Sequence, residues 1–315
     1  MKNHHIIFTR LAAIFFIVCG VLGGIAVLPA FAQTSNTNES ASQISEIKDK
    51  IRQLFELQDS TTIPQQDKDT QEFKLRRATL TLIVETALKQ TSVARDEFRK
   101  VQLPNSDDWK QIYNSILSSF EASLAYYRDI EDHIDTDSTL TSALLKNIAR
   151  DMEQKKVSEI DPLIKKSHAI VAAFNVSDML KIADERLTKI KLDVDQIYTQ
   201  KLTRSQTLKQ LFEKASVTLN DAHDLNTTSK EIILNAYTTP ETGSSTEYIN
   251  TLYKKLRLEE KTLASSTQLA NDVSHPDAAV IETYLQKIIT DSITHIKSAY
   301  DIFMKMSSNV KAYLK

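Results

Sequence analysis

Glycine is almost absent from this chain once its first 28 residues are set aside. The 315 residues include four glycines, and three of them, Gly20, Gly23 and Gly24, lie before residue 28. Gly243 is the single glycine in the rest of the chain. Tight hairpins, nucleotide-binding loops and strained nucleophile turns depend on glycine, because glycine alone adopts positive φ at little cost. The chain is therefore expected to consist of helices joined by loose polar turns.

Apolar residues recur every three or four positions through most of the chain, which is the period of an amphipathic helix. A first short helix is predicted from Ile44 up to the segment 61–64, and a second ends at Pro104. Ser106 is expected to cap a third helix, whose first turn is acidic. A fourth is predicted to run from about residue 139 to about Phe174.

Two residues should interrupt or restart this fourth helix. Pro162 removes one intrahelical hydrogen bond and is expected to kink or split the helix. Ser177 is expected to cap the next helix start.

From Leu180 to Leu225 the apolar residues alternate at spacings of three and four, which is typical of a coiled-coil-like seam. Neither proline nor glycine occurs between Leu163 and Thr239. The in-phase continuation favours one very long helix over residues 177–237. Lys201 and Arg204 fall on the seam, however, and favour two helices that meet near residue 203. The sequence leaves both alternatives open.

The fold expected is all-α: elongated bundles of long antiparallel helices joined by short polar turns, a pattern compatible with two four-helix units. Residues 44–175 are assigned to an N-terminal bundle and residues 177–315 to a C-terminal bundle. Residues 238–246 form the clearest predicted loop, and two further helices are expected after it.

The first 32 residues have the pattern of an export signal. A short basic start is followed by a continuous apolar or small run from Leu11 to Leu28, and Pro29 ends it. Ala30 and Ala32 supply the small side chains that a signal peptidase recognises before cleaving ahead of Gln33. The alternative is an uncleaved membrane anchor that leaves the rest of the chain facing outside. Residues 33–43 are rich in Ser, Thr, Asn and Gln and are predicted to be a disordered tether.

The composition narrows the compartment and the partners. Cys19 lies in the leader, so the chain beyond residue 32 has no cysteine, whereas a eukaryotic secreted domain of this size would usually carry disulfides. This favours a periplasmic, cell-envelope or extracellular protein of a bacterium. Removing Lys2 and Arg10 with the leader leaves 37 basic against 41 acidic residues, a net charge of −4. That balance argues against nucleic acid as a partner.

Candidate metal sites are weak. The acidic segment 131–137 begins like a calcium loop at Asp135, but Leu140 replaces the required glycine and Lys146 the final glutamate. A turn that caps the following helix explains the segment better. Asp291 and His295 lie one helical turn apart, a spacing that is ordinary on helix surfaces.

Sequence motifs for catalysis are missing as well. The chain has no Gly-x-Ser-x-Gly, no glycine-rich phosphate loop and no Cys-x-x-Cys-His. No catalytic residue, cofactor or metal is predicted. Paired lysines such as Lys165-Lys166 suggest solvated faces, and one ring of Tyr126-Tyr127 is expected to face solvent or a partner.

These observations predict an exported, non-enzymatic structural or interaction protein that contacts another protein. No span of the chain beyond residue 32 is apolar enough to cross a membrane, and self-association is left open. The alternative is an extracytoplasmic bundle that binds a ligand between its helices, as a sensor does.

Overall fold

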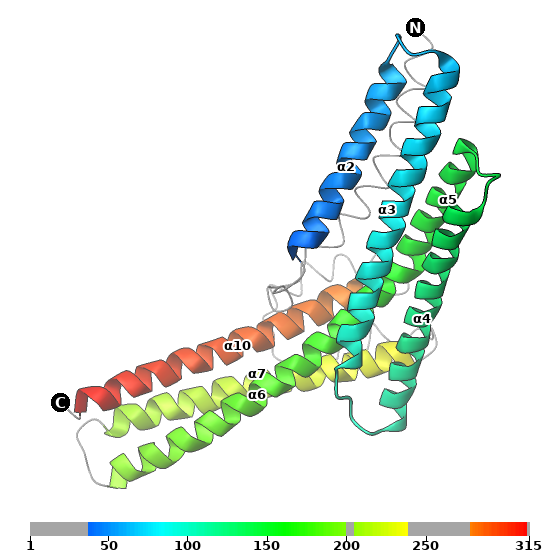
Figure 1. The fold of residues 1–315 in the computed structure, drawn as a ribbon. Helices are drawn as coiled ribbons and strands as arrows, with labels where there is room; N and C mark the ends of the chain where they lie inside the picture. The colour runs from blue at the N-terminus through cyan, green and yellow to red at the C-terminus, as the bar shows by residue number, and fades with distance from the viewer. Residues whose placement is uncertain (1–36, 200–204, 239–277, 314–315) are drawn as a thin grey trace. The chain divides into compact units, whose positions relative to one another are not determined.

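The computed structural model describes residues 37–199, 205–238 and 278–313 (Figure 1). These ranges contain helices and no strand, which confirms the all-α prediction. The elements in chain order are α2 (Thr37–Asp59), α3 (Gln65–Arg99), α4 (Asp107–Thr136), α5 (Ser142–Lys155), the π-helical turn η1 (Lys156–Ile160), α6 (Asp161–Thr199), α7 (Ser205–Thr238) and α10 (Ala278–Tyr313).

Several predicted features fall outside the described residues. They are the leader with Ala30 and Ala32, the interruption at Lys201 and Arg204, and most of the loop and helix expected after residue 238. Helix α2 begins at Thr37, so it includes part of the segment 33–43 that was expected to be a tether. Polar residues are compatible with a helical first turn.

The described residues divide into two compact units. Unit 1 contains residues 37–99 and 115–165, and unit 2 contains residues 100–114 together with the described residues from 166 onward. The boundary expected at 175–177 lies inside α6, which continues from Asp161 to Thr199. Ser177 does not begin a helix: its hydroxyl donates to the carbonyl oxygen of Ala173 at 3.2 Å. A serine that bonds to the preceding turn is tolerated within a helix, so its preference for caps did not decide the boundary.

Unit 1 is held together by an apolar core to which α2, α3, α4, α5 and η1 contribute. Tyr127, 1 % exposed, is the largest fully buried side chain there. The other members are Ile47, Leu80, Ile83, Val84, Ala87, Ile134, Leu140, Leu145, Met152 and Ile160.

Basic residues of α3 contact the carboxyl ends of two neighbouring helices in unit 1. Lys68 Nζ donates to the carbonyl oxygens of Gln58 at 2.6 Å and Ser60 at 3.1 Å, at the end of α2. Arg77 Nη2 donates to the carbonyl oxygen of Asp135 at 3.0 Å, in the last turn of α4. Cations at these positions satisfy carbonyl groups that the helix leaves unpaired and complement the helix dipole.

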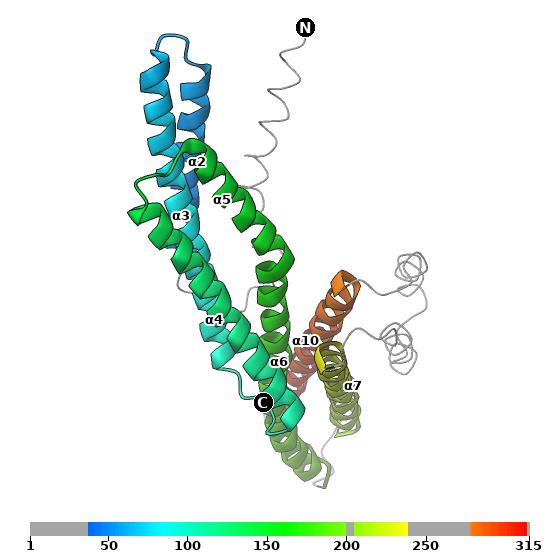
Figure 2. The same ribbon diagram turned by 90° about the vertical axis from the view of Figure 1, so that its right-hand side faces the viewer.

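Pro162 lies directly after the π-helical turn. In η1 the backbone N–H of Asp161 donates to the carbonyl of Lys156, five residues earlier, instead of four. Because a proline ring clashes with the carbonyl four residues before it, the widened turn accommodates Pro162 without ending the helix. The predicted disturbance at Pro162 therefore takes the form of a π turn, and α5 continues through it into α6. Figure 2 shows α5 and α6 as one continuous helical ribbon.

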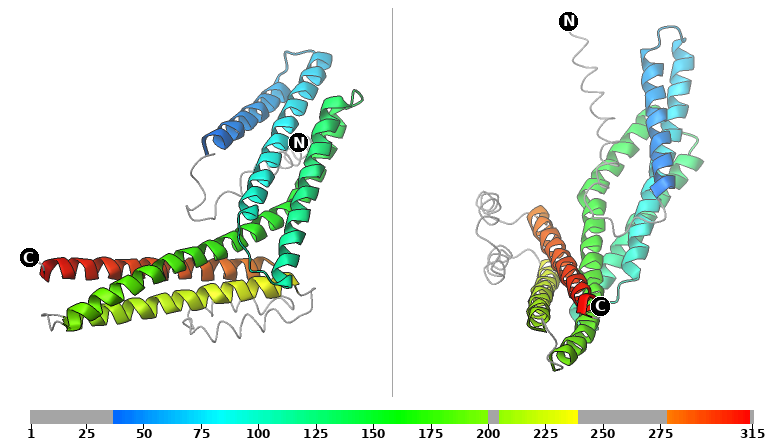
Figure 3. Two further views of the ribbon diagram at one scale, coloured as in Figure 1. Left: turned by 60° about the horizontal axis from the view of Figure 1, so that its bottom comes forward. Right: turned by 90° about the vertical axis from the view of Figure 1, so that its left-hand side faces the viewer.

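Unit 2 is built around α6, α7 and α10, which lie side by side (Figure 3). The region 177–237 contains two helices, since α6 ends at Thr199 and α7 begins at Ser205. Contacts between them join residues whose numbers rise on α6 and fall on α7, so the two helices are antiparallel. Helix α10 also packs along α7, where Ser292 Oγ donates to the carbonyl oxygen of Ala222 at 2.9 Å.

Within the three described ranges, no helix combines the length and apolar character that crossing a membrane requires.

Candidate functional site

Four side-chain contacts cross from α6 to α7 in unit 2, and together they form what we call the α6–α7 polar seam. Its members on each helix are three to eight residues apart, which places them along one stripe of that helix. The contacts pair Lys166 with Tyr237, Phe174 with Lys230, Ser177 with Asn226, and Asp184 with His223.

Both lysines of the seam place their ammonium groups over aromatic rings. Lys166 Nζ lies 3.7 Å from the ring centroid of Tyr237, and Lys230 Nζ lies 4.6 Å from that of Phe174. Burial lowers the pKa of each lysine, and the carboxylate of Asp178 partly offsets the shift at Lys230. The facing rings favour the charged ammonium and so also oppose this shift.

Tyr237 is itself largely enclosed. Burial raises the pKa of its phenol, and the nearby carboxylate of Glu282 on α10 raises it further. The phenol is therefore neutral at physiological pH, and its ring serves Lys166 as an aromatic surface.

Asn226 is the most buried polar member of the seam, with 5 % of its surface exposed. Its Nδ2 donates to Ser177 Oγ at 2.8 Å, and its backbone carbonyl accepts from Ser229 Oγ at 2.7 Å. Its Oδ1 is buried without a hydrogen bond. A buried amide with one unpaired atom costs stability, so the seam is more polar than simple helix packing requires.

Two histidine–aspartate pairs lie on different sides of α7. His223 Nε2 lies 2.9 Å from Asp184 Oδ2 of α6, and both side chains are nearly half exposed. His295 Nδ1 of α10 lies 4.0 Å from Asp221 Oδ2. Asp291 is instead held by Lys287 at 2.7 Å, so the Asp291–His295 spacing seen in the sequence does not produce a shared site.

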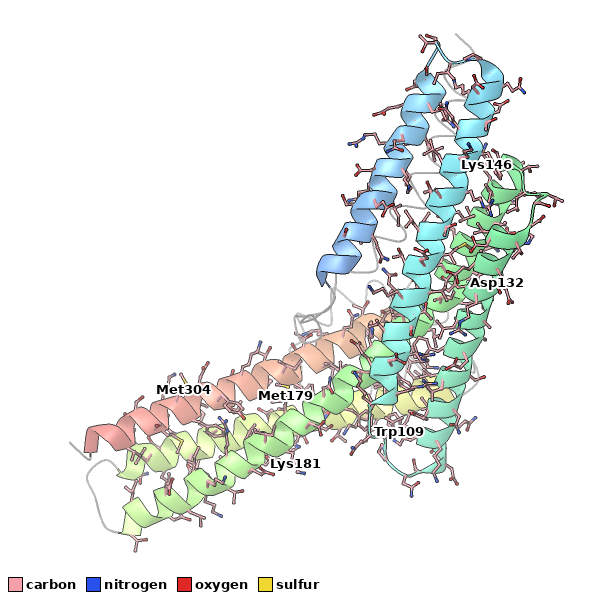
Figure 4. All side chains as sticks on the ribbon, viewed as in Figure 1. Trp109, Asp132, Lys146, Met179, Lys181 and Met304 are labelled. Carbon is pink, nitrogen blue, oxygen red and sulfur yellow. The ribbon has the colours of Figure 1, made fainter. Side chains whose placement is uncertain are left out.

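The first residues of α4 also belong to unit 2. Trp109 is 5 % exposed, and its ring meets the edge of Phe174 with centroids 5.1 Å apart and planes at 88°. Figure 4 labels Trp109 near the start of α4. The rings of Trp109 and Phe174 and the ammonium of Lys230 therefore form one aromatic–cationic cluster at the seam.

The acidic segment 131–137 lies in unit 1, where residues 131–136 are the last residues of α4 and the turn begins only at Asp137. The expectation that this segment is a turn that caps the following helix is therefore wrong for residues 131–136. Asp137 Oδ1 accepts from the backbone N–H and the hydroxyl of Thr139, both at 2.7 Å. These bonds lower the pKa of the Asp137 carboxyl. Thr141 caps α5 by accepting from the N–H of Leu144. Asp132 stands on the outer surface of α4 (Figure 4), exposed to solvent.

Among the described residues, no three His, Cys, Asp or Glu side chains converge closely enough to hold a metal ion. Apart from the aromatic residues, the buried polar side chains in the same ranges are Ser, Thr and Asn, and no carboxylic acid, histidine, lysine or arginine is among them. Of the tyrosine pair, Tyr127 is 1 % exposed, and Tyr126 is half-buried against the unit 1 core and beneath Lys155, whose Nζ lies 5.0 Å from the ring centroid. The expectation that one of the two rings faces solvent or a partner is therefore not confirmed.

The sequence pattern alone does not predict the seam. The lysine pair Lys165-Lys166 is expected on a solvated face, but Lys166 is half-buried against Tyr237. The spacing of Lys166, Phe174 and Ser177 was the available signal, because these residues share a stripe next to the apolar positions of α6. Pairing that stripe with the matching stripe of α7 required the tertiary structure.

Comparison with protein-family models, with curated proteins and with solved structures finds no match for this chain.

Proposed function

We propose that this chain is an exported, non-enzymatic helical protein of a bacterial cell envelope or exterior, which acts through its architecture and through contact with another protein. The leader of residues 1–32 supports export: a basic start, an apolar run, Pro29 and the small residues Ala30 and Ala32 occur in the order a signal peptidase requires.

The distribution of ionisable groups is the observation that carries the non-enzymatic assignment. Active sites usually bury acids and bases so that their pKa values shift toward the working pH. Apart from the aromatic residues, the buried polar side chains in the described ranges are Ser, Thr and Asn, and carboxylates such as Glu159 and Asp291 pair with lysines at the surface. Of the ionisable seam members, only Asp184 and His223 form an acid–base pair, and it is nearly half open to water.

Exposed apolar side chains on unit 2 are candidate contact points for a partner. Leu192 of α6 is 66 % exposed and Met304 of α10 is 68 % exposed. Figure 4 shows Met304 on the outer surface of α10. Single exposed apolar residues are common, so the proposal uses these positions as places to search for a partner.

Site-specific photo-crosslinking in the producing cells tests this proposal. A photoreactive phenylalanine analogue is placed at Leu192 or Met304, and a matched control carries it at Thr290, an exposed polar position of α10. Discrete adducts from Leu192 or Met304, weaker or missing from Thr290, support a specific protein contact. A chain that stays uncrosslinked at both apolar positions while it accumulates in the envelope contradicts the interaction role.

A ligand-binding bundle is the second candidate, and the polar seam favours it. Half-buried ammonium groups, aromatic rings and the unpaired Oδ1 of Asn226 are the kinds of group that hold a small polar molecule between helices. Native mass spectrometry of the protein purified from its own cells tests this. A co-purifying mass that disappears in Asn226→Leu but persists in Asp132→Asn, a surface control in unit 1, would favour this candidate.

A further inference from the structure

Helices α7 and α10 bury matching positions at a spacing of seven residues. On α7 these are Leu208, Ala215, Ala222 and Ser229, and none exceeds 1 % exposure. On α10 they are Leu285, Ser292, Ala299 and Met306, all at 2 % exposure or less. Seven residues are two helical turns, so each set forms one stripe that faces the partner helix.

The hydrogen bond from Ser292 Oγ to the carbonyl of Ala222 shows which residues of the two stripes lie opposite each other. The Asp221–His295 contact has nearly the same alignment. The helices are antiparallel, so a step of seven residues along one helix matches a step of seven residues back along the other. Starting from Ala222 opposite Ser292, one such step in each direction places Ala215 opposite Ala299 and Ser229 opposite Leu285. A second step beyond Ala215 places Leu208 opposite Met306.

Residue size differs along the facing stripes of α7 and α10. The two central layers, Ala215 with Ala299 and Ala222 with Ser292, hold small residues on both helices. Small residues let helix backbones approach closely, and α7 and α10 make the most extensive close backbone approach of any described helix pair. Both outer layers contain a larger side chain, Leu285 in one and Leu208 with Met306 in the other.

The connection between α7 and α10 has enough residues to permit several alignments of the two helices. Residues 239–277 separate the two helices, whereas residues 200–204 alone separate α6 from α7. A short connection limits how far antiparallel helices can slide, but a long one is compatible with several alignments. If residue size is ignored, α10 can shift by seven residues along α7 and buried positions still lie opposite buried positions.

We propose that the small central layers lock α7 and α10 in one of several alignments related by seven residues. A shift of α10 in one direction places Leu285 against Ala222. A shift in the other direction places Met306 against Ala215. Either shift puts a large side chain into a layer that fits only small ones, and the backbones must then separate. The lock therefore depends on size, and the Ser292 hydroxyl is secondary because a helix offers a carbonyl acceptor at every turn.

Disulfide trapping in the full-length chain tests the lock, with Cys19→Ser to remove the native cysteine. Ala215→Cys with Ala299→Cys reports the alignment seen here. Ala222→Cys with Ala299→Cys reports a shift of one repeat and shares one cysteine with the first pair. In the observed alignment the second pair is offset by two turns, beyond the reach of a disulfide. Mild oxidation should crosslink the first pair and leave the second reduced.

Two substitutions then separate size from hydrogen bonding. Ser292→Leu should cause loss of crosslinking in the 215–299 pair, whereas Ser292→Ala, which keeps the small size, should retain it. Comparable crosslinking of both cysteine pairs without a change at 292 would overturn the proposal, as would equal loss in Ser292→Ala and Ser292→Leu. Circular dichroism shows whether Ser292→Leu has unfolded, and the comparison of the two cysteine pairs does not depend on that variant.

Discussion

Replacing Trp109 by alanine should destabilise unit 2 strongly, because this residue is 5 % exposed and packs edge-on against Phe174. An indole buries on the order of 200 Å², which at about 25 cal/mol per Å² corresponds to about 5 kcal/mol as an upper limit. Measured Trp→Ala costs in protein cores are about 3–5 kcal/mol, and that is the loss expected here.

Urea unfolding followed by circular dichroism measures the loss, since Trp109→Ala removes the only tryptophan. Trp109→Phe is the matched control: it keeps an aromatic ring against Phe174 and should lose clearly less than the alanine variant. The unmodified chain provides an independent test, because all of its tryptophan fluorescence comes from this site. Blue-shifted emission that iodide quenches poorly is expected. Red-shifted, readily quenched emission with an unchanged unfolding midpoint in Trp109→Ala would refute the packing described for α4.

Three further predictions concern single residues. Hydrogen bonds from Thr139 lower the pKa of the Asp137 carboxyl, so this carboxylate stabilises the fold above the ordinary carboxyl pKa of about 3.9. That stabilisation is lost as the pH falls through the lowered pKa of the folded state. Asp137→Asn should lower the urea midpoint at pH 7, and carbon NMR titration should show the carboxyl of the folded chain ionising at lower pH than that of the unfolded chain. Pro162→Ala removes the ring that the π turn accommodates, so residues 156–160 should become regular α-helix. Amide hydrogen exchange and a structure of the variant check this. An unchanged π turn in the variant would show that Pro162 is not the cause of the turn. Burial raises the pKa of Tyr127 and Tyr237, so both phenols should stay protonated when exposed tyrosines ionise near pH 10, and the stability they contribute should be lost as the pH rises further. Absorbance of the tyrosinate anion should show a second ionisation step at higher pH, and this step should be smaller in Tyr127→Phe and in Tyr237→Phe. A second step of unchanged size in both variants would contradict the burial of these rings.

The fold class was predictable because helix periodicity is a local property of the sequence. The buried stripe of α4, including Trp109 and Phe120, follows directly from apolar spacing. The sequence left open whether residues 177–237 form one helix or two, and the structure has two, with α6 ending at Thr199 and α7 beginning at Ser205. Lys201 and Arg204, the charged residues that favoured a break, lie outside the described residues.

The unit boundaries were less predictable because they depend on tertiary contacts. Ser177 has the chemistry of a cap, yet its hydroxyl bonds to Ala173 within α6 and to Asn226 across the seam. The charge of Lys166 favours a surface position in a reading of the sequence, but its aliphatic stem favours apolar surroundings. The ring of Tyr237 suits both parts, because it is an apolar surface for the stem and attracts the ammonium group. Local periodicity gives no basis for pairing residues 39 to 71 positions apart, so the α6–α7 polar seam is visible only in the folded chain.

Export underlies the whole proposed function, and the N-terminus of the protein recovered from its native cells tests it most directly. Mass spectrometry of the protein from the envelope or the medium should find a chain that begins at Gln33, because Ala30 and Ala32 place the cleavage there. An intact chain from Met1 recovered with the cytoplasmic fraction would contradict export, and with it an envelope role. An intact chain recovered with membranes would instead establish the anchored form.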